Sequence, residues 1–325
     1  MGVSALRPAG LAALLIAVSS LVACHTGART GLAELEPRGQ IALTFDDAPM
    51  GDGAFLTGDE RTSRLIATLE EADVHGAMLF VLTENIADQP QGPARLKAYA
   101  EAGFKLANHT HTHAGLSGTD TDEYLAGIDA AASILSDYGN TSPFFRYPYL
   151  DEGRTTDKRD AIRAGLEARG LRSGYVTVDT YDWYMNALAA EAVKNGHPVD
   201  MGALGAAYVE TLVGDVEFYD RIAQATLGRS PAHVLLLHEN DLAALFVGGL
   251  VKELRRRGWE IIPAEDAYAD AISADVPNTL FNGQGRVAAI AHAEGVFKGS
   301  ELISPDEDED WLRADFIRRG LLPAE

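Results

Sequence analysis

The chain has 325 residues, enough for one large or two ordinary domains with a buried core. Its formal net charge of −21 argues against nucleic acid and anionic membrane surfaces as partners, and its single cysteine excludes a disulfide within the chain. The composition is otherwise that of a globular protein, so the charge first of all provides solubility.

The first 23 residues have the pattern of an export signal. Arg7 precedes an apolar run over residues 11–22, which is shorter than a membrane-spanning helix requires. The run ends in Leu-Val-Ala-Cys at residues 21–24, which resembles the cleavage box of bacterial lipoproteins. We therefore expect a signal peptide over residues 1–23, a lipid on Cys24 that anchors the protein to the membrane, and a tether over residues 24–39. The protein would face the periplasm or the exterior; an ordinary secretory signal with an incidental cysteine is the alternative.

From Gln40 onward, short apolar runs alternate with amphipathic helical patterns. The expected strands are Ile41–Phe45, Ala77–Leu82, Phe104–Ala107, Phe144–Tyr147, Gly174–Val178, Val234–Leu237 and Glu260–Ile262. The expected helices include Glu60–Ala72, Asp122–Tyr138, Thr156–Ala168 and Asp241–Arg256. This alternation predicts an α/β fold of parallel strands joined by crossover helices. About seven such units are compatible with a closed or nearly closed (β/α) barrel.

The domain organisation follows from these patterns. We expect a catalytic domain over residues 40–270, with a helical insertion at about 187–230 before the sixth strand. Residues 271–325 form a C-terminal extension that is partly irregular. Its acidic run Pro305–Asp310 predicts a solvated loop or a helix start, and it lacks the alternating ligands of a calcium loop. The GQGRV at residues 283–287 is too weak a motif to predict nucleotide binding.

Polar side chains gather where the expected strands end. They are Asp46 and Asp47 at the first strand, His109 and His113 after the third, Arg146 at the fourth, Asp182 and Trp183 after the fifth, and His238 at the sixth. The carboxyl ends of parallel strands meet at one face of a barrel, and barrel enzymes build their active sites there. The sequence therefore predicts one site assembled from five separate segments.

Asp47, His109 and His113 are the candidate metal ligands. Two imidazoles and one carboxylate suit Zn²⁺, with Co²⁺, Ni²⁺ and Mn²⁺ also compatible, and three protein ligands leave room for water and substrate. The spacing of four places both imidazoles on one side if a helical turn begins there. If the segment is extended instead, His111 shares a face with the other two histidines. We prefer His109 and His113 as the metal ligands, with His111 either in contact with the ligands or exposed to solvent.

The remaining polar residues suit amide or ester hydrolysis. A bound metal ion polarises the substrate carbonyl and lowers the pKa of its water. Asp46 would accept a proton from that water, and Arg146 would orient Asp46 and keep it ionised. His238 would protonate the departing amine, while Asp182 holds its tautomer and raises its pKa. Taken singly, each of these residues also has a structural explanation. Paired aspartates after a strand, for example, more often form a turn or a helix cap than a catalytic pair.

Five motifs in this chain resemble those of the polysaccharide deacetylase family, carbohydrate esterase family 4. They are TFDDAP at residues 44–49, HTHTH at 109–113, RYPY at 146–149, DTYDW at 179–183 and LLLH at 235–238. The resemblance implies a distorted seven-stranded (β/α) barrel that removes N- or O-acetyl groups from sugars, with Asp46 as base and His238 as acid. It also assigns Tyr149, Trp183 and Leu236 to substrate binding, the last two around the acetyl methyl group.

Three substitutions depart from the family pattern and leave the substrate open. Ala48 replaces a glycine, Leu150 stands where a glycine usually follows the third motif, and Glu239 replaces an aspartate. We expect an acetylated glycan as substrate and no nucleic acid or protein partner. The alternatives are a hydrolase of a small non-sugar amide and a catalytically silent carbohydrate-binding protein, which the complete set of polar residues argues against.

Overall fold

The computed structural model describes residues 1–2 and 38–324. The predicted signal peptide, Cys24 and most of the predicted tether lie outside the described residues, so these remain predictions. Within the described ranges, no helix combines the length and the apolar character needed to cross a membrane.

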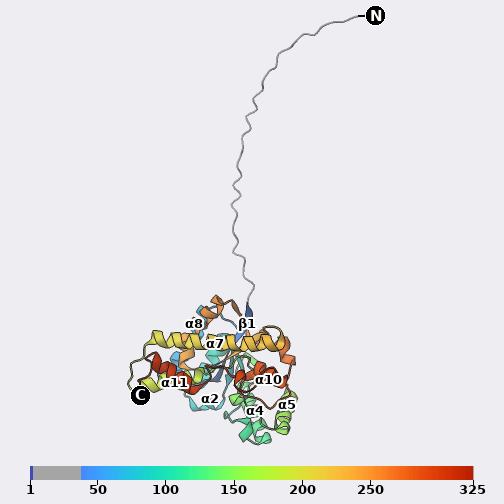
Figure 1. The fold of residues 1–325 in the computed structure, drawn as a ribbon. Helices are drawn as coiled ribbons and strands as arrows, with labels where there is room; N and C mark the ends of the chain where they lie inside the picture. The colour runs from blue at the N-terminus through green and yellow to red at the C-terminus, as the bar shows by residue number, and fades with distance from the viewer. Residues whose placement is uncertain (3–37, 325) are drawn as a thin grey trace. The chain divides into compact units, whose positions relative to one another are not determined.

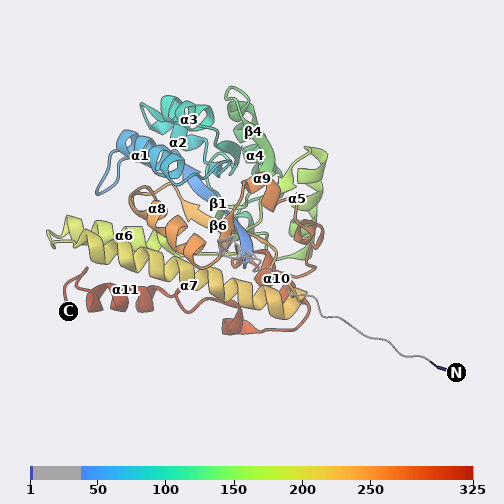
Figure 2. The ribbon, with the colours of Figure 1, turned by 90° about the horizontal axis from the view of Figure 1, so that it is seen from above.

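A parallel sheet forms the centre of residues 38–324 (Figures 1 and 2). Its seven strands in this part of the chain are β1 (Gly39–Ala48), β2 (Met78–Val81), β3 (Lys105–Asn108), β4 (Thr141–Phe145), β5 (Arg172–Ser173), β6 (Ala232–His238) and β7 (Trp259–Ile261). The strand order is β5-β4-β3-β2-β1-β6, and β7 pairs with β1. The sheet curls into a half-barrel with helices around it, which confirms the predicted α/β class and the distorted barrel of parallel strands.

Helices surround the sheet. They are α1 (Gly58–Glu71), α2 (Glu84–Asp88), α3 (Gly92–Glu101), α4 (Thr121–Leu135), α5 (Thr156–Ala168), α6 (Asp182–Lys194), α7 (Met201–Leu227), α8 (Asp241–Arg256), α9 (Ala264–Ala267), α10 (Gly285–Ala293) and α11 (Glu309–Arg318). Short 3₁₀ turns lie at Leu116–Gly118, Pro148–Leu150, Ala271–Ala274 and Gly299–Leu302. Helices α6 and α7 occupy most of residues 182–227, and Figure 2 shows α7 alongside α8 and α10.

Strand β1 pairs with β2, β6 and β7 and places the first motif. Ile41, Leu43 and Phe45 on one face and Ala42 and Thr44 on the other are buried, as expected for a parallel strand that is covered on both faces. Its register with β6 pairs Asp46 with His238. The two residues predicted to move protons therefore end neighbouring strands at the same edge of the sheet.

The prediction of a regular strand over residues 174–178 is wrong. Strand β5 ends at Ser173, and the next segment forms no continuous ladder with the sheet but an isolated bridge between Val178 and Leu235 and a few separate backbone hydrogen bonds. Gly174 passes so close to the Phe80 ring that a Cβ at this position would lie 2.4 Å from a ring carbon. Its N–H donates to the carbonyl of Phe145 at 2.6 Å. The backbone is therefore held by packing and scattered hydrogen bonds, and side-chain alternation does not predict such a path.

The C-terminal segment is part of the same hydrophobic core. Val287 and Ile290 of α10 and Leu312 and Phe316 of α11 are buried in it. The predicted helix start is confirmed, since the Asp308 side chain caps α11. The prediction of a solvated loop is wrong for Glu307, which is only 5% exposed and whose Oε1 accepts from the Tyr219 hydroxyl at 2.7 Å.

Candidate active site

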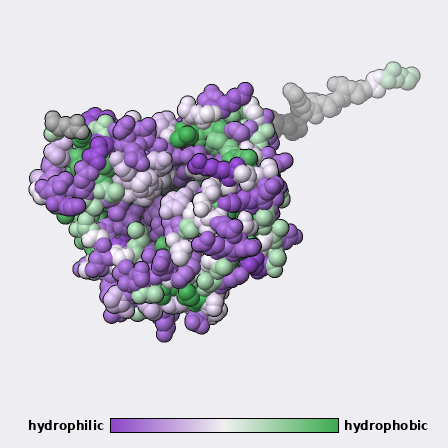
Figure 3. Space-filling model, turned by 90° about the horizontal axis from the view of Figure 1, so that it is seen from below, coloured by the Kyte–Doolittle hydropathy of each residue, from purple (hydrophilic) through white to green (hydrophobic). Residues whose placement is uncertain are grey.

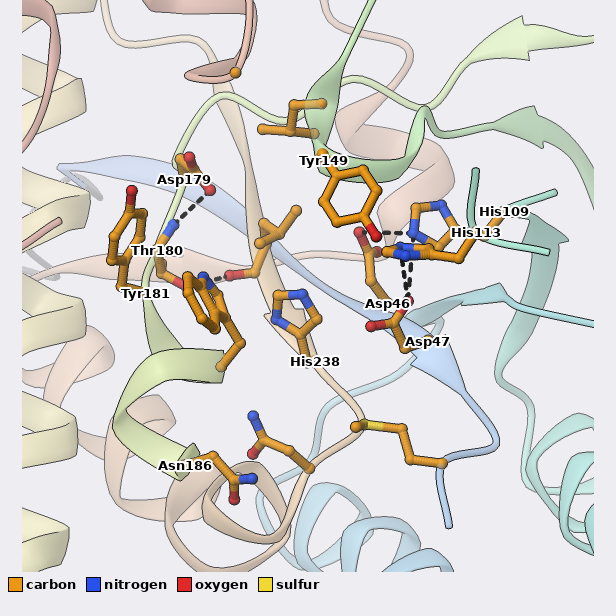
Figure 4. A pocket seen from close by; sticks show the side chains of 16 residues that line it. Asp46, Asp47, His109, His113, Tyr149, Asp179, Thr180, Tyr181, Asn186 and His238 are labelled. Atoms are coloured by element: carbon orange, nitrogen blue, oxygen red, sulfur yellow. Dashed lines mark hydrogen bonds and ion pairs between the residues drawn. The ribbon is translucent and has the colours of Figure 1, made fainter. Parts of the chain in front are cut away.

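A pocket of about 400 Å³ opens at the carboxyl ends of the strands. Among its lining residues are the predicted site residues Asp46, Asp47, His109, His113, Tyr149, Trp183, Leu236 and His238 (Figure 4). The face drawn in Figure 3 is hollowed near its centre, with hydrophilic residues around the hollow. The two other predicted residues, Arg146 and Asp182, are buried behind the pocket wall.

Asp47, His109 and His113 form a group that could hold a metal ion. Their ligand atoms lie within 4.8 Å of one another, and Asp47 Oδ1 is 3.5 Å from His109 Nε2 and 3.2 Å from His113 Nε2. Asp47 Oδ1 is buried and has no hydrogen-bond partner among the described residues. A buried carboxylate oxygen without a partner is costly, and a cation between these three side chains would remove that cost. The donor set therefore fits a divalent metal ion.

The tautomer of His109 also suits metal binding. His109 Nδ1 lies 2.9 Å from the carbonyl oxygen of Arg146, so Nδ1–H donates there and Nε2 keeps its lone pair facing Asp47. Metal-binding histidines characteristically donate their second ring nitrogen to such an acceptor. Burial lowers the pKa of His109 to about 3, which keeps the imidazole neutral.

Of the two conformations considered for the histidine segment, the helical turn does not form. Thr110 and His113 adopt the left-handed region, with φ of 68° and 56°. The side chain of Asn108 accepts from the N–H of Thr110 at 2.9 Å, and the hydroxyl of Thr110 accepts from the N–H of His113 at 3.1 Å. These side-chain contacts replace the helical hydrogen bonds and turn His113 back toward His109.

His111 lies outside the metal-binding group. Its Nδ1 is 2.9 Å from the hydroxyl of Thr83. Its ligand atoms are not among those that converge on Asp47. The structure therefore brings together the two histidines that we preferred from the sequence.

Arg146 forms an ion pair with Asp46 and fixes its orientation. Asp46 is 3% exposed, and its Oδ1 accepts from Arg146 Nη1. The guanidinium also donates to the carbonyl of Gly174 at 2.8 Å and to the hydroxyl of Tyr268 at 3.0 Å. Its carbon lies 3.7 Å from the centre of the Phe80 ring. A guanidinium fixed on three sides gives Asp46 one orientation, with Oδ2 free of this ion pair.

His238 is paired with Asp182. Its Nδ1 lies 2.7 Å from Asp182 Oδ1, and Asp182 Oδ2 accepts from the backbone N–H of His238 and from Asn240 Nδ2, each at 3.0 Å. Burial by itself lowers the pKa of His238, but the charge and hydrogen bond of Asp182 outweigh it, and the pKa rises to about 10. His238 therefore carries a proton at neutral pH.

Exposed aromatic side chains stand at the pocket. Tyr149 is 68% exposed, and its ring centre lies 4.5 Å from that of His113. Trp183 is 41% exposed and packs against Tyr181 and Tyr184. Leu236 is buried at the pocket wall. The residues predicted for substrate binding thus present apolar surface to the cavity.

Some residues of the site carried no usable sequence signal. Tyr268 follows α9 and reaches Arg146 only through the fold. The GQGRV motif, which the sequence left without a role, places Gly283 in the pocket lining, where its N–H donates to the carbonyl of Leu150 at 3.2 Å. A Cβ at Gly285, whose φ is 83°, would lie 2.8 Å from the Val176 carbonyl oxygen, so this turn requires glycine. Asp179 also lines the pocket, and its motif position gave it no role.

Known proteins resemble this chain in sequence and fold. Residues 34–168 match the family model described as polysaccharide deacetylase. A peptidoglycan-N-acetylglucosamine deacetylase from Bacillus cereus is 28% identical over 159 residues, which are 49% of this chain and 50% of that protein. The chain thus spans about half the length of the curated relative it matches.

Solved structures with a similar chain trace include those of an esterase and a deacetylase. A family 4 carbohydrate esterase from Streptomyces lividans has 22% identity and a TM-score of 0.46, over 69% of this chain and 91% of its own. A polysaccharide deacetylase from Bacillus cereus has 22% identity and a TM-score of 0.49, over 69% and 90%. The family model and the sequence relative thus show that residues 34–168 are similar to the polysaccharide deacetylase family.

Proposed function

We propose that the protein is a metal-dependent hydrolase that removes acetyl groups from an N-acetylated, or O-acetylated, glycan. The observation that carries the proposal is that a candidate base and a candidate acid, each held by a charged partner, lie at the same pocket. Asp46 with Arg146 and His238 with Asp182 both meet the cavity that contains the metal-binding group. A hydrolase of this kind needs a base for water and an acid for the leaving group within one cavity.

Zn²⁺ is the metal that the donor set favours, and Co²⁺, Ni²⁺ and Mn²⁺ are compatible with it. Asp47, His109 and His113 would hold the ion. When bound, it would supply a Lewis acid for the acetyl carbonyl and a water of lowered pKa.

The protein's own groups would then move the protons. Asp46 would take a proton on Oδ2 while Arg146 holds Oδ1 in place. Asp182 fixes Nδ1–H of His238, so Nε2–H is the proton available for the sugar nitrogen. The water oxygen would first add to the acetyl carbonyl carbon; the carbon–nitrogen bond would then break as the nitrogen takes the proton from His238, and acetate and a free amine would be released. Leu236 and Trp183 would contact the acetyl methyl group.

Acetate release tests this function. Metal-loaded protein is incubated with N-acetylglucosamine oligomers, peptidoglycan and acetylated polysaccharides, and acetate is measured. Release from any of them supports the proposal and names the substrate class. No acetate release from any of these substrates, with metal bound, would favour a small-amide hydrolase. Glycan binding without turnover in any metal would favour a binding protein.

Asp182→Asn should move the alkaline limb of the pH profile to lower pH. The charge of Asp182 raises the pKa of His238, and the acid form is active, so activity should fall as the pH rises past that pKa. Without the carboxylate, the limb should move toward the ordinary histidine value of about 6.5. The measurement is kcat/KM against pH, with the exposed Asp310→Asn as control. A limb that stays in place would show that another group is the acid.

We also propose that the protein is exported and anchored through a lipid on Cys24. The support is the sequence pattern at residues 1–24 alone. In a bacterial host, the chain should fractionate with membranes, and Cys24→Ala should move it to the soluble fraction. Membrane association that survives the substitution would contradict the anchor.

A further inference from the structure

Asp179 is a pocket-lining carboxyl that the proposed mechanism does not use. Figure 4 shows it across the pocket from His109 and His113. It is 7% exposed, and its Oδ1 accepts from the N–H of Thr180 at 2.9 Å. Among the described residues, its Oδ2 makes no hydrogen bond. One oxygen of a buried acceptor at the cavity wall is therefore available to a ligand.

Two buried carboxyls of other elements lie behind this wall. Asp215 of α7 accepts from the hydroxyl of Ser304 at 2.6 Å, and Glu307 accepts from Tyr219. Each has a second oxygen, Asp215 Oδ2 and Glu307 Oε2, that is buried and without a partner among the described residues. Neither residue lines the pocket.

Charge in this group concentrates on Asp179. Burial, with repulsion from Asp306 and then Asp179, raises the pKa of Asp215 well above its ordinary value, and burial with repulsion from Asp179 raises the pKa of Glu307 to about 10. Burial raises the pKa of Asp179 only to about 7, because the Thr180 N–H and the His238 charge oppose it, while Asp182 and Asp46 add to the rise. The member that ionises near neutral pH is thus the one at the cavity.

We propose that Asp179 is a specificity-determining residue that accepts hydrogen bonds from hydroxyl groups of the sugar that bears the acetyl group. This inference rests on the proposed function. The exposed rings of Tyr149 and Trp183 offer apolar surface for the face of a sugar ring, and Asp179 supplies the polar contact that a pocket needs to orient it. A small acetyl compound without a sugar would have nothing to place against Asp179.

The test compares a sugar substrate with a sugar-free one. kcat and KM are measured on N-acetylglucosamine oligomers and on p-nitrophenyl acetate for the wild type, Asp179→Ala and Asp179→Asn. In Asp179→Ala we expect the KM for the oligomer to rise roughly ten- to hundredfold, as for loss of a hydrogen bond to a charged group. The loss of kcat/KM on the oligomer should exceed the loss on the ester by about tenfold or more.

Two further readouts separate binding from a structural role. The KM of the wild type for the oligomer should fall as the pH rises through about 7, where Asp179 gains its charge, and Asp179→Asn should abolish this dependence. Asp215→Asn is the matched control, because it keeps an acceptor for Ser304 and lies outside the pocket lining. At pH 8 its KM for the oligomer should match that of the wild type.

Each remaining outcome overturns the inference. Equal losses on oligomer and ester would make Asp179 a structural residue. An unchanged KM in Asp179→Ala, with a wild type that deacetylates the oligomer, would overturn this inference alone and leave the proposed function standing. A wild type that hydrolyses the ester but no acetylated sugar would refute the proposed function, and this inference with it.

Discussion

Asp46→Asn is expected to lower kcat for acetate release by roughly two to four orders of magnitude while the bound metal stays in place. Asparagine keeps the shape of the side chain and an oxygen that can accept from Arg146. It replaces Oδ2, the atom proposed to take the proton, by an amide that cannot act as a base. Because Asp46 is outside the group of three converging ligands, metal binding should survive.

The measurement pairs acetate release with metal content. Both are determined on the same preparation of Asp46→Asn, with the exposed Asp88→Asn as the matched control. Loss of metal together with turnover would make Asp46 a ligand. Full turnover with full metal would show that another group is the base.

His113→Ala is expected to abolish stable metal binding. It removes one of three side-chain ligands and leaves the buried Asp47 Oδ1 facing His109 alone. Loss of an outer-shell partner already weakens metal sites by about 10–100-fold, and loss of a direct ligand should cost more. Zn²⁺ should therefore no longer raise the Tm of this variant, since a metal stabilises the fold only in proportion to its binding.

His111→Ala is the matched control for this prediction. It removes an imidazole from the same loop, one that contacts Thr83 and not the metal-binding group. Its metal content after dialysis and its Zn²⁺-dependent Tm shift should equal those of the wild type. Full metal occupancy in His113→Ala, with loss in His111→Ala, would reverse the assignment of the ligands.

The period of apolar residues was sufficient to predict most of the sheet and the helices. Strand β6 and helix α8 follow runs whose patterns are unambiguous, because burial of one face or of both leaves a regular mark on the sequence. Residues 174–178 were mispredicted as a strand for the same reason. Their side chains are buried, but their backbone joins the sheet through separate hydrogen bonds and one bridge, not through a continuous ladder.

The sequence by itself determined which chemical groups meet at the pocket. Asp46, Asp47, His109 and His238 each stand at or just after a strand end, and parallel strands bring those ends to one edge whatever their loops do. Only the tertiary structure decided how these groups are held. The turn that brings His113 to Asp47 depends on side-chain hydrogen bonds, and the contacts of Tyr268, Gly283 and Glu307 join segments that are distant along the chain. Such contacts have no period in the sequence, because they arise only when separate elements pack together.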